Sequence, residues 1–323
     1  MHHFSNVTLA LAALLLEATI GYPAFVYRAV GHPVTWMGAS LAGLEVRLNR
    51  PSASDRLRRV WGIVTLGVIL AATAGAAVAF DRIVLLGPIG LGLLIVAASS
   101  LIAQRSLHDH VRTVADALQR EGLEAGREAV SMIVGRNPDR LDEAGVARAA
   151  IESLAENFSD AVVAPTVWLA VLGLPGAALY KATNTADSMV GHRTSRYAAF
   201  GWAAARLDDL VNLPASRLAV LFLVLAAVAT GGSARGAIRA VARDARRHRS
   251  PNAGWPEAAM AGALGLQLAG PRVYGEQMVD DAFMGDGRQG ATAADIIRAL
   301  RLFRAGCVVQ WLVLLAVVLI WQG

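Results

Sequence analysis

The sequence predicts an all-α, polytopic membrane protein with four clear membrane-spanning helices and one or two weaker or re-entrant spans. Of the 323 residues, 55% are hydrophobic and only 17% are charged, whereas about a quarter of a soluble domain is charged. Apolar runs close to the roughly 20 residues that cross a bilayer recur along the chain. Arginines gather between these runs, which is typical of cytoplasmic loops.

The first candidate span covers residues 8–25. We interpret it as a retained span and not as a signal peptide, because no Lys or Arg precedes its apolar run and Glu17 lies within it. Residues 26–59 follow as a loop that ends in a group of arginines. These arginines predict a cytoplasmic position for the loop.

Two further spans form a hairpin. Residues 60–80 and 83–103 are apolar and are joined at Asp81 and Arg82. Residues 305–321 form the last clear span, in which Trp311 and Trp321 are candidates for interfacial anchors.

Two other apolar segments are weaker. Residues 162–180 contain Pro165, Pro175 and several glycines, and residues 213–230 follow a highly polar stretch. We predict that residues 162–180 are broken or re-entrant. The polar stretch 181–212 then lines a cavity open to the cytoplasm, where irregular backbone is tolerated.

Residues 104–160 are predicted to form a cytoplasmic helical insertion. Within it, residues 108–128 have the period of one amphipathic helix, and a second helix begins near Asp139 or Asp142. The apolar face of the first helix comprises Val111, Val114, Ala115 and Leu118. Since no internal repeat or linker interrupts the chain, we predict one membrane-embedded domain over residues 1–323.

Several classes of protein are excluded by what the sequence lacks. The excess of Lys and Arg over Asp and Glu fits the positive-inside rule for cytoplasmic loops, so no nucleic-acid partner is expected. Cys307 is the single cysteine, so no disulfide framework exists. The chain has no G-x-x-x-x-G-K-[ST], H-E-x-x-H or G-x-S-x-G motif, which excludes a P-loop and two common hydrolase sites.

Three carboxylates are spaced by four residues at the end of the insertion. Glu152, Glu156 and Asp160 would lie along one face of a regular helix. Like charges on one face repel one another, so they are either compensated by a metal such as Mg²⁺ with phosphate oxygens or paired with arginines. Asn157 lies between them as a coordinating, orienting or capping residue.

The only lysine of the chain lies in a second polar group. Helical spacing brings Lys181, Asn184, Asp187 and Ser188 to one side of a helix. Such a set suits binding of phosphate and neutralisation of its charge. The alternative is that Lys181 extends to lipid headgroups.

A third polar group directly precedes residues 213–230. The group comprises Arg206, Asp208, Asp209, Asn212 and Arg217. Asp208 and Asn212 share a helix face, and Asp209 points elsewhere. A local network of Arg–Asp ion pairs explains this group as well as catalysis does. For His32, the residues alone favour a structural, hydrogen-bonded histidine over a ligand or a base.

Long motifs in the chain carry a family resemblance. They are ESLAENFSDAVVAP from Glu152, YKATNTADSMVG from Tyr180, ARLDDLVNLPASR from Ala205 and SPNAGWPEAAMAGALGLQLAGP from Ser250. Shorter matches include Glu17, Gly21-Tyr22-Pro23, His32-Pro33-Val34, Ile133-Val134-Gly135-Arg136 and Gly285-Asp286. In this order and over nearly the whole chain, they resemble the CbiB/CobD family of cobalamin biosynthesis, the adenosylcobinamide-phosphate synthases.

The resemblance implies an ATP-dependent amide ligation. A propionate carboxylate of adenosylcobyric acid is joined to the amine of (R)-1-amino-2-propanol or its O-phosphate, which gives adenosylcobinamide or its phosphate. ATP and Mg²⁺ are the implied cofactors, and membrane lipid and other enzymes of the pathway are potential partners. The implied location is the inner membrane, crossed several times, with the active site facing the cytoplasm.

The resemblance and this chemistry together give a set of expected site residues. The expected catalytic residues are Glu152, Glu156, Lys181, Asp187 and Asp208, and the expected metal ligands are Glu156, Asp160 and Asp187. The residues expected to bind substrate or phosphate are His32, Arg136, Asn157, Asn184, Ser188, Arg193, Asp209, Asn212, Asn252 and Glu257.

The chain departs from the family pattern at a few positions, and two other functions stay open. Tyr22 stands where the family usually has aspartate, Asn137 follows Arg136 in place of aspartate, Ala161 replaces glycine and His192 replaces tyrosine. A membrane transporter for corrinoids or small molecules would also place polar residues inside a helix bundle. A membrane scaffold for cobalamin-pathway enzymes is the other alternative.

Overall fold

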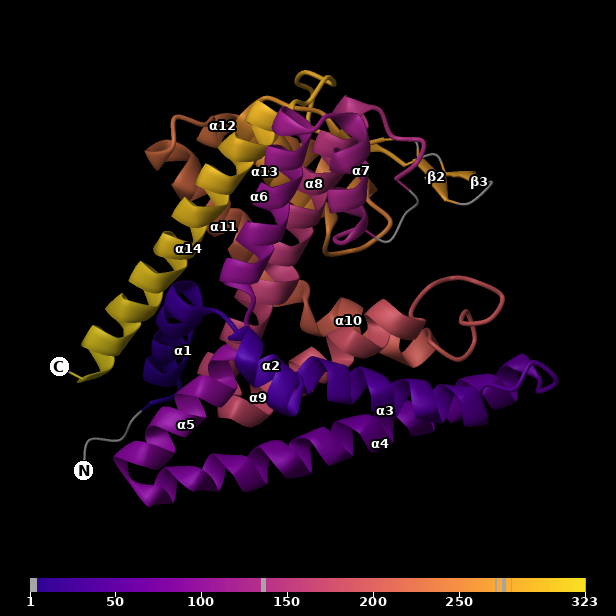
Figure 1. Cartoon of the computed structure of the whole chain (residues 1–323), viewed down its shortest axis with the longest axis vertical. Coiled ribbons are helices and arrows are strands. Elements are labelled where there is room, and N and C mark those ends of the chain that lie inside the picture. Colours follow the sequence, from indigo (N-terminus) through magenta and orange to yellow (C-terminus); the bar gives the residue numbers. More distant parts are fainter. Residues whose placement is uncertain (1–4, 135–137, 271, 275–276, 280, 323) are drawn as a thin grey trace. The chain divides into compact units, whose positions relative to one another are not determined.

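The chain is helical almost throughout, as a computed structural model describes for residues 5–134, 138–270, 272–274, 277–279 and 281–322 (Figure 1). It forms two compact units. Unit 1 contains Met1–Ala103, Ala164–Asn212 and Leu314–Gly323, and unit 2 contains Gln104–Val163 and Leu213–Val313. The single membrane-embedded domain over residues 1–323 stays a prediction.

Unit 1 is built from helices that pack around a small apolar core. Its elements are α1 (Asn6–Ile20), α2 (Ala24–Val30), α3 (Pro33–Leu48), α4 (Asp55–Asp81), the 3-10 helix η1 (Arg82–Leu86), α5 (Pro88–Ser99), α9 (Ala164–Val190), α10 (Trp202–Val211) and the end of α14 (Ala293–Gln322).

The core of unit 1 fixes the ends of α9 and α10 against the α3–α4 hairpin. Helices α3 and α4 run side by side (Figure 1), and both contact α9. The buried core residues are Leu41, Leu66, Ile69, Ala182, Ala186, Val190, Phe200 and Ala204. Small residues of α9 allow this close packing, so the opposite, polar side of α9 is held in a defined orientation.

Unit 2 contains the insertion and most of the C-terminal part of the chain. Its elements are α6 (Gln104–Arg120), α7 (Leu123–Ser131), α8 (Glu143–Asn157), the π-helix η2 (Phe158–Val163), α11 (Leu213–Ala229), α12 (Ala234–Asp244), the 3-10 helix η3 (Ala245–Arg247), α13 (Gly254–Leu264), β1 (Leu268–Ala269), β2 (Arg272–Tyr274), β3 (Gln277–Val279), β4 (Phe283–Met284) and the first part of α14.

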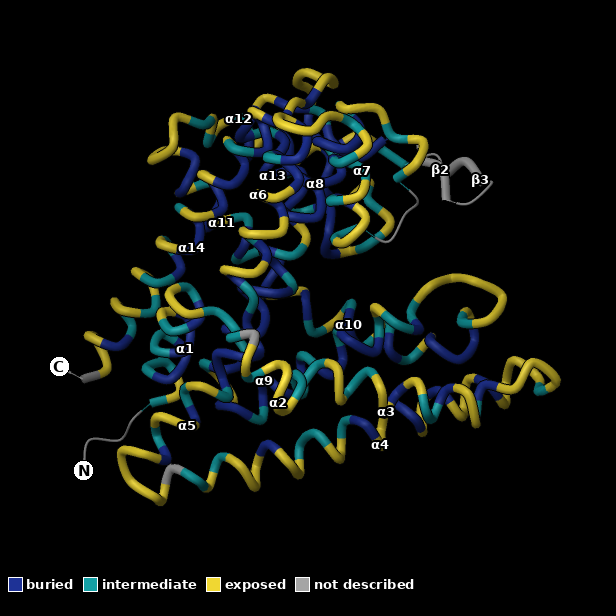
Figure 2. Tube along the Cα trace, in the orientation of Figure 1, coloured by how far each residue is buried: buried dark blue, intermediate teal, exposed yellow. Residues whose placement is uncertain are grey.

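The helices of unit 2 pack around α8 and α13, which are largely buried (Figure 2). Strand β1 pairs with β4 and β2 pairs with β3, both antiparallel. The sequence did not predict these short strands. They are ladders of two or three residues within an otherwise helical protein.

The insertion of residues 104–160 contains one more helix than predicted. The expected helix over residues 108–128 is wrong, because Gly122, with φ +90°, ends α6 and begins α7. Its predicted apolar face is buried as expected. The next helix begins where the acidic residues indicated, since Asp142 caps α8 by accepting a hydrogen bond from Gly145 N at 2.7 Å.

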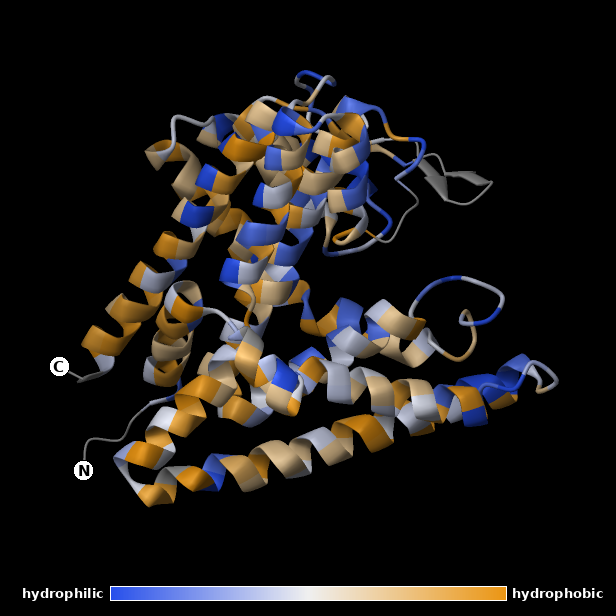
Figure 3. Cartoon of the chain, viewed as in Figure 1, coloured by the Kyte–Doolittle hydropathy of each residue, from blue (hydrophilic) through white to orange (hydrophobic). Residues whose placement is uncertain are grey.

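The described residues include four helices long and apolar enough to cross a membrane: Asp55–Asp81, Pro88–Arg120, Glu143–Val190 and Ala293–Trp321. Counting two broken pairs as one span each, Asn6–Ile20 with Phe25–Leu48 and Trp202–Val211 with Leu213–Ala229, raises the number to six. Between its charged ends, α4 is mostly hydrophobic along its length in Figure 3, as expected for a helix in lipid. The predicted helical, multi-pass membrane protein is confirmed, and its orientation stays a prediction.

Three predicted boundaries of unit 1 are wrong. The first span ends at Ile20 and not at residue 25, because Gly21 adopts φ +67° and Pro23 follows. The expected loop 26–59 is mostly helix, namely most of α2, all of α3 and the start of α4. The second arm of the hairpin begins at Pro88, after the 3-10 helix η1.

The weak segment 162–180 is interrupted, as predicted. Helix α9 breaks at Gly173, where φ is +67°, two residues before Pro175. A left-handed backbone conformation is open to glycine and costs other residues free energy, so this glycine sets the position of the break. The re-entrant course of the segment stays a prediction.

Candidate functional site

The polar residues of α9 lie along its solvent-accessible side in unit 1. Lys181, Asn184 and Asp187 are half-buried and Ser188 is exposed, whereas Ala182 and its apolar neighbours are buried. The helical period therefore places the four side chains on one side, as the spacing indicated. The Ser188 hydroxyl donates to Asn184 O at 2.9 Å, which is a bond within the helix itself.

Asp208 is the centre of a hydrogen-bond network that joins α10 to α9. Its Oδ1 accepts a hydrogen bond from Asn184 Nδ2 at 3.3 Å, and its Oδ2 accepts one from Asn212 Nδ2 at 3.0 Å. Asn212 Oδ1 in turn accepts from the Tyr180 hydroxyl at 2.9 Å. Asp208 is 8% exposed and Asn212 is 1% exposed, so this chain of contacts is largely shielded from solvent.

No Lys, Arg or His in the described part of the chain forms an ion pair with Asp208. Its hydrogen-bond donors are the two amides, and its charged neighbours are Asp187 and Asp209. Arg206, which the sequence offered as a partner, pairs with Asp209 at 3.7 Å. The alternative of an Arg–Asp ion-pair network therefore applies to Asp209 and not to Asp208, a buried acid that no described cation pairs with.

Asp187 lies against the start of the loop that follows α9. A Cβ atom added at Gly191 would overlap the Asp187 carboxylate, so the glycine leaves room for this side chain. Asp187 and Asp208 are also within electrostatic range of one another. The exposed Arg193 is within electrostatic range of Asp209.

His32 has a structural task in unit 1. Its Nδ1 accepts a hydrogen bond from Val34 N at 3.2 Å and caps α3, and the Tyr22 ring packs edge-on against it at 4.5 Å between centroids. The imidazole also lies within electrostatic range of Lys181. The structural role favoured from the residues alone is thus present, close to the polar side of α9.

The carboxylates of α8 in unit 2 occupy different environments. Glu152 is buried, and its Oε1 accepts a hydrogen bond from Ala269 N at 2.8 Å, whereas Glu156 is exposed and Asp160 is half-buried. The π-helix η2 begins at Phe158, and its wider turn changes the register of the side chains. The regular spacing expected for the three acids is therefore interrupted before Asp160.

Asn157 and the Ser153 side chain tie the end of α8 to its surroundings. Asn157 Nδ2 donates to Ser153 O at 2.9 Å, and Ser153 Oγ donates to Ile133 O at 2.8 Å. The Asn157 side chain thus stabilises the last turn of α8 through a hydrogen bond to a backbone carbonyl of the same helix. Its expected role in binding substrate stays a prediction.

A second polar cluster of unit 2 surrounds Asn252, at the start of α13. Asn252 Oδ1 accepts hydrogen bonds from Ser216 Oγ at 3.1 Å and from Arg217 Nη1 at 2.7 Å. The Arg217 guanidinium stacks over the Trp255 ring at 4.3 Å. The sequence motif indicated Asn252, but not that the segment around Arg217 is its partner.

The same loop holds a buried acid beside a histidine. Glu257 Oε1 lies 3.7 Å from His248 Nε2, and both side chains are largely buried. His248 Nδ1 accepts a hydrogen bond from Ser250 N at 3.0 Å, which orients the ring toward Glu257. The His248 and Glu257 side chains are therefore held in defined positions in this segment.

Comparison with known proteins assigns the chain to a family. The profile of the CobD/Cbib protein family matches residues 10–303. The chain is 49% identical to the cobalamin biosynthesis protein CobD of a Sinorhizobium species over 320 residues, 98% of this chain and 99% of that protein. It is 47% identical to the cobalamin biosynthesis protein CobD of Rhodobacter capsulatus over 312 residues, 97% of each chain. The chain belongs to the CobD/CbiB family. No solved structure matches it.

In this CobD/CbiB protein, Tyr22 shows how the chain accommodates one departure from the expected family pattern. The Tyr22 hydroxyl donates to Gly31 O at 2.7 Å while its ring packs on His32. The aromatic residue therefore supports the cap of α3 and carries no negative charge. Arg136, another expected site residue, lies outside the described residues.

Mg²⁺, which the family resemblance implied, has a suitable set of donors in unit 1 of the CobD/CbiB chain. Within the described ranges, no three His, Cys, Asp or Glu side chains are grouped closely enough to hold a metal ion alone. Proteins usually bind Mg²⁺ through one or two carboxylates plus phosphate oxygens of the substrate. Asp187 and Asp208, with the Asn184 amide, provide this kind of set.

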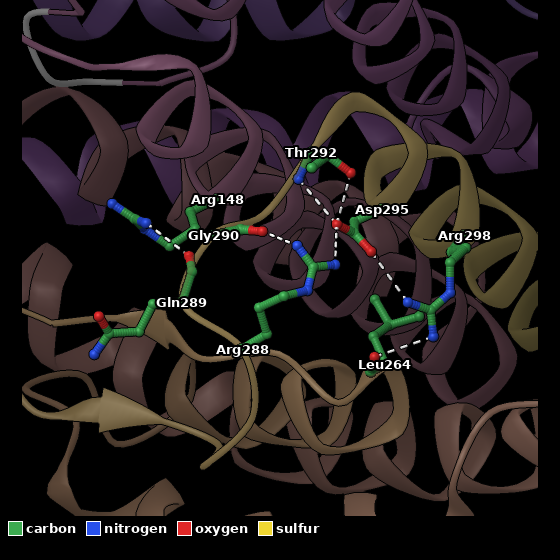
Figure 4. A network of polar contacts seen from close by, with 8 residues as sticks. All are labelled: Arg148, Leu264, Arg288, Gln289, Gly290, Thr292, Asp295 and Arg298. Atoms are coloured by element: carbon green, nitrogen blue, oxygen red, sulfur yellow. Dashed lines mark hydrogen bonds and ion pairs between the residues drawn. The ribbon is translucent and has the colours of Figure 1, made fainter.

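The CobD/CbiB chain also contains a buried polar network that the sequence did not single out (Figure 4). Asp295 accepts hydrogen bonds from Arg288 at 2.6 Å, Arg298 at 3.0 Å and Thr292 N at 2.9 Å. It fixes the loop before α14 to the first turn of that helix. Because its charge is balanced by two guanidinium groups, we assign Asp295 to stability and not to catalysis.

Proposed function

We propose that this CobD/CbiB protein is an ATP-dependent amide ligase that joins adenosylcobyric acid to (R)-1-amino-2-propanol or its O-phosphate. Family membership establishes a role in cobalamin biosynthesis. The observation that carries the ligase assignment is Asp208, a buried carboxylate that hydrogen-bonds to amides and lies near Asp187 without a cationic partner in the described chain. An acid in this state suits a cationic ligand such as an ammonium group or a phosphate-bound Mg²⁺.

The reaction needs an activated carboxylate and a free amine. The substrate carboxylate attacks the γ-phosphorus of ATP, which forms an acyl phosphate and releases ADP. The amine, after its ammonium form has lost a proton, attacks the acyl carbon, and phosphate leaves as the amide bond forms. The site therefore has to balance phosphate charge, accept one proton and hold the amine close to the acyl carbon.

The residues of unit 1 supply these functions. Lys181 and Arg193 provide positive charge for phosphate groups, and Asn184 orients Asp208. Asp208 accepts the ammonium as a ligand and takes up its proton. When bound, Mg²⁺ would neutralise charge on the phosphoryl group and would be held by Asp187, which leaves Asp208 to the ammonium.

The residues of unit 2 contribute to binding of the larger substrates. Glu152 uses one oxygen to hold the backbone at Ala269, so we assign it to shaping this part of the chain. For unit 2, metal or amine binding by Glu156 and Asp160 and substrate contact by Asn252 and Glu257 stay predictions. Because ATP is cytosolic, the proposed site faces the cytoplasm.

The test is a ligation assay with the full-length protein purified in detergent. Adenosylcobyric acid, Mg-ATP and either amine are incubated with the protein, and the mass of the corrinoid is measured. Lys181→Ala and Asp187→Ala are each expected to lower kcat/KM at least about 100-fold. Asp116→Asn, in the exposed Arg112–Asp116 pair of unit 2, is the control expected to keep full activity.

Two results would overturn the proposal. One is an unchanged corrinoid mass with both amines, although the protein is folded and ATP is present. The other is corrinoid flux into liposomes that requires no ATP turnover, since this is the behaviour of a transporter. Near-normal ligation by either α9 variant would remove that residue from the site.

A further inference from the structure

A buried network outside the proposed site fixes the loop that connects α9 to α10. We call Glu45, Asn49, Arg58 and Arg196 the clamp. The Glu45 carboxylate accepts two hydrogen bonds from the Arg196 guanidinium, Nε to Oε1 at 3.0 Å and Nη2 to Oε2 at 2.8 Å. Glu45 is 5% exposed, whereas the Arg196 side chain is 59% exposed, so the loop reaches inward to a buried acid.

The other two clamp residues hold the backbone of the loop. Asn49 Nδ2 donates to Glu45 Oε1 at 2.8 Å and to Arg196 O at 3.0 Å. Arg58 donates to Asn49 Oδ1 at 2.9 Å, to Ser195 O at 3.2 Å and to Arg196 O. Two successive carbonyls of the loop are therefore fixed by side chains from α4 and the end of α3.

Close backbone packing fixes the same loop at its ends. A Cβ atom at Gly62 of α4 would overlap the carbonyl oxygen of Phe200, and one at Gly201 would overlap that of Val190. At the other end, Gly191 lies against the Asp187 carboxylate. A loop held in this way keeps its shape before any ligand arrives.

The clamp contributes little to the stability of the fold, because burying its charged groups costs desolvation free energy. Glu45 and Arg58 are buried and lose most of their water, whereas Arg196 stays exposed, so these charges add little stability compared with apolar residues of the same volume. Such a network is better explained by the conformation that it imposes. The conformation imposed here is that of residues 192–196, which are exposed in unit 1 (Figure 2).

The exposed part of the loop carries groups that bind anions. Arg193 lies within electrostatic range of Asp209, next to Asp208, and His192 is exposed beside it. The hydroxyls of Thr194 and Ser195 make no side-chain hydrogen bond to other residues that the structure describes. A guanidinium with neighbouring hydroxyls matches the charge and the hydrogen-bonding capacity of a phosphoryl group.

We infer that residues 192–195 form a preorganised binding loop for a phosphoryl group, and that the clamp residues are its positioning residues. The loop begins at Gly191, which packs against the Asp187 carboxylate, and Arg193 lies within electrostatic range of Asp209, so a phosphoryl group bound there adjoins the carboxylates of unit 1. The inference rests on the proposed function only in naming ATP or aminopropanol phosphate as the source of that group. The clamp lowers the cost of binding because the loop needs no reordering.

The experiment measures protection of the loop by phosphate ligands. Ser195→Cys is made in a Cys307→Ala background and labelled with a maleimide, with ATP, aminopropanol phosphate or inorganic phosphate as the probe. We expect ATP or aminopropanol phosphate to slow labelling. In Glu45→Gln or Arg196→Lys, half-protection should need at least about ten times more ligand, the equivalent of about 1.4 kcal/mol. Asp116→Asn serves as the control with unchanged protection.

The labelling assay does not depend on ligation, so the two proposals fail separately. Phosphate protection without any ligation would overturn the ligase and keep the loop. Ligation by a protein whose loop no phosphate compound protects would overturn the loop. Equal protection in the clamp variants and the control would show that the clamp only joins α3 to α4. In a protein that ligates, the clamp variants should raise the KM for the phosphate compound that protects the loop and leave the KM for the corrinoid unchanged.

Discussion

Replacing Asp208 by asparagine separates its chemical role from its structural role. The substitution keeps the size of the side chain and removes the negative charge. An asparagine oxygen can still accept from one of Asn184 and Asn212, so one hydrogen bond of about 0.5–1.5 kcal/mol is lost. Because Asp208 has no cationic partner among the described residues, neutralising it leaves no cation uncompensated. Because removing a buried charge offsets part of the lost hydrogen bond, we expect the free energy of unfolding to change by no more than about 1 kcal/mol.

The matched comparison is Asp295→Asn. Asp295 accepts charged hydrogen bonds from Arg288 and Arg298 and two more from Thr292. Breaking a fully buried ion pair costs about 3–5 kcal/mol, and both guanidinium groups here are about half exposed, so we expect about 2–4 kcal/mol. For 150–250 residues, 1 kcal/mol shifts Tm by about 2–4 °C.

The assay combines thermal unfolding in detergent with the ligation assay. Asp208→Asn should keep Tm within about 4 °C of the wild type and lower kcat/KM at least about 100-fold. Asp295→Asn should lower Tm by about 4–16 °C and keep much of its activity at low temperature. The reasoning is refuted if Asp208→Asn retains more than half of its activity, or if it loses as much stability as Asp295→Asn.

Three other predictions concern single residues. Tyr180→Phe removes the hydroxyl that donates to Asn212 and should cost about 1–3 kcal/mol, measured as a lower Tm; an unchanged Tm would contradict it. Ala269→Gly should raise stability by about 0.5–1 kcal/mol, because Ala269 has φ +57°; a lower Tm would argue against strain there. Burial raises the pKa of Asp244, but hydrogen bonds from Arg243 outweigh this and hold the pKa below its usual value. Its stabilisation is therefore present above the unfolded pKa of about 3.9 and is lost as the pH falls through the folded value, so the Tm difference between wild type and Asp244→Asn should shrink below about pH 4.

The class of fold was predictable because a helix that crosses lipid must be apolar over about 20 residues, and the sequence shows such segments directly. The boundaries were less predictable, because single glycines decide them. Gly21, Gly122 and Gly173 all have positive φ and end or break a helix, but each is one of 31 glycines in the chain. A glycine permits this conformation without requiring it, so the sequence alone does not show where the backbone uses it.

Part of the candidate site follows from local periodicity. The shared side of Lys181, Asn184 and Asp187 depends only on the period of α9, and the pairing of Asp208 with Asn212 depends on one turn of helix. The contact between Tyr180 and Asn212 joins residues 32 positions apart. No spacing rule predicts it, because tertiary packing brings α9 and α10 together.

The acids of unit 1 and unit 2 look alike in the sequence, and only their partners distinguish them. Glu45 is balanced by Arg196, Asp244 by Arg243 and Asp295 by Arg288. A buried acid balanced in this way has no remaining charge to offer a ligand, so its substitution acts on conformation or stability. Asp208 is held by amides, and in the described structure no cation pairs with it. Its burial is favourable only with a proton or a cation from outside the protein, and in the ligase that we propose the amine or a metal ion supplies this positive charge.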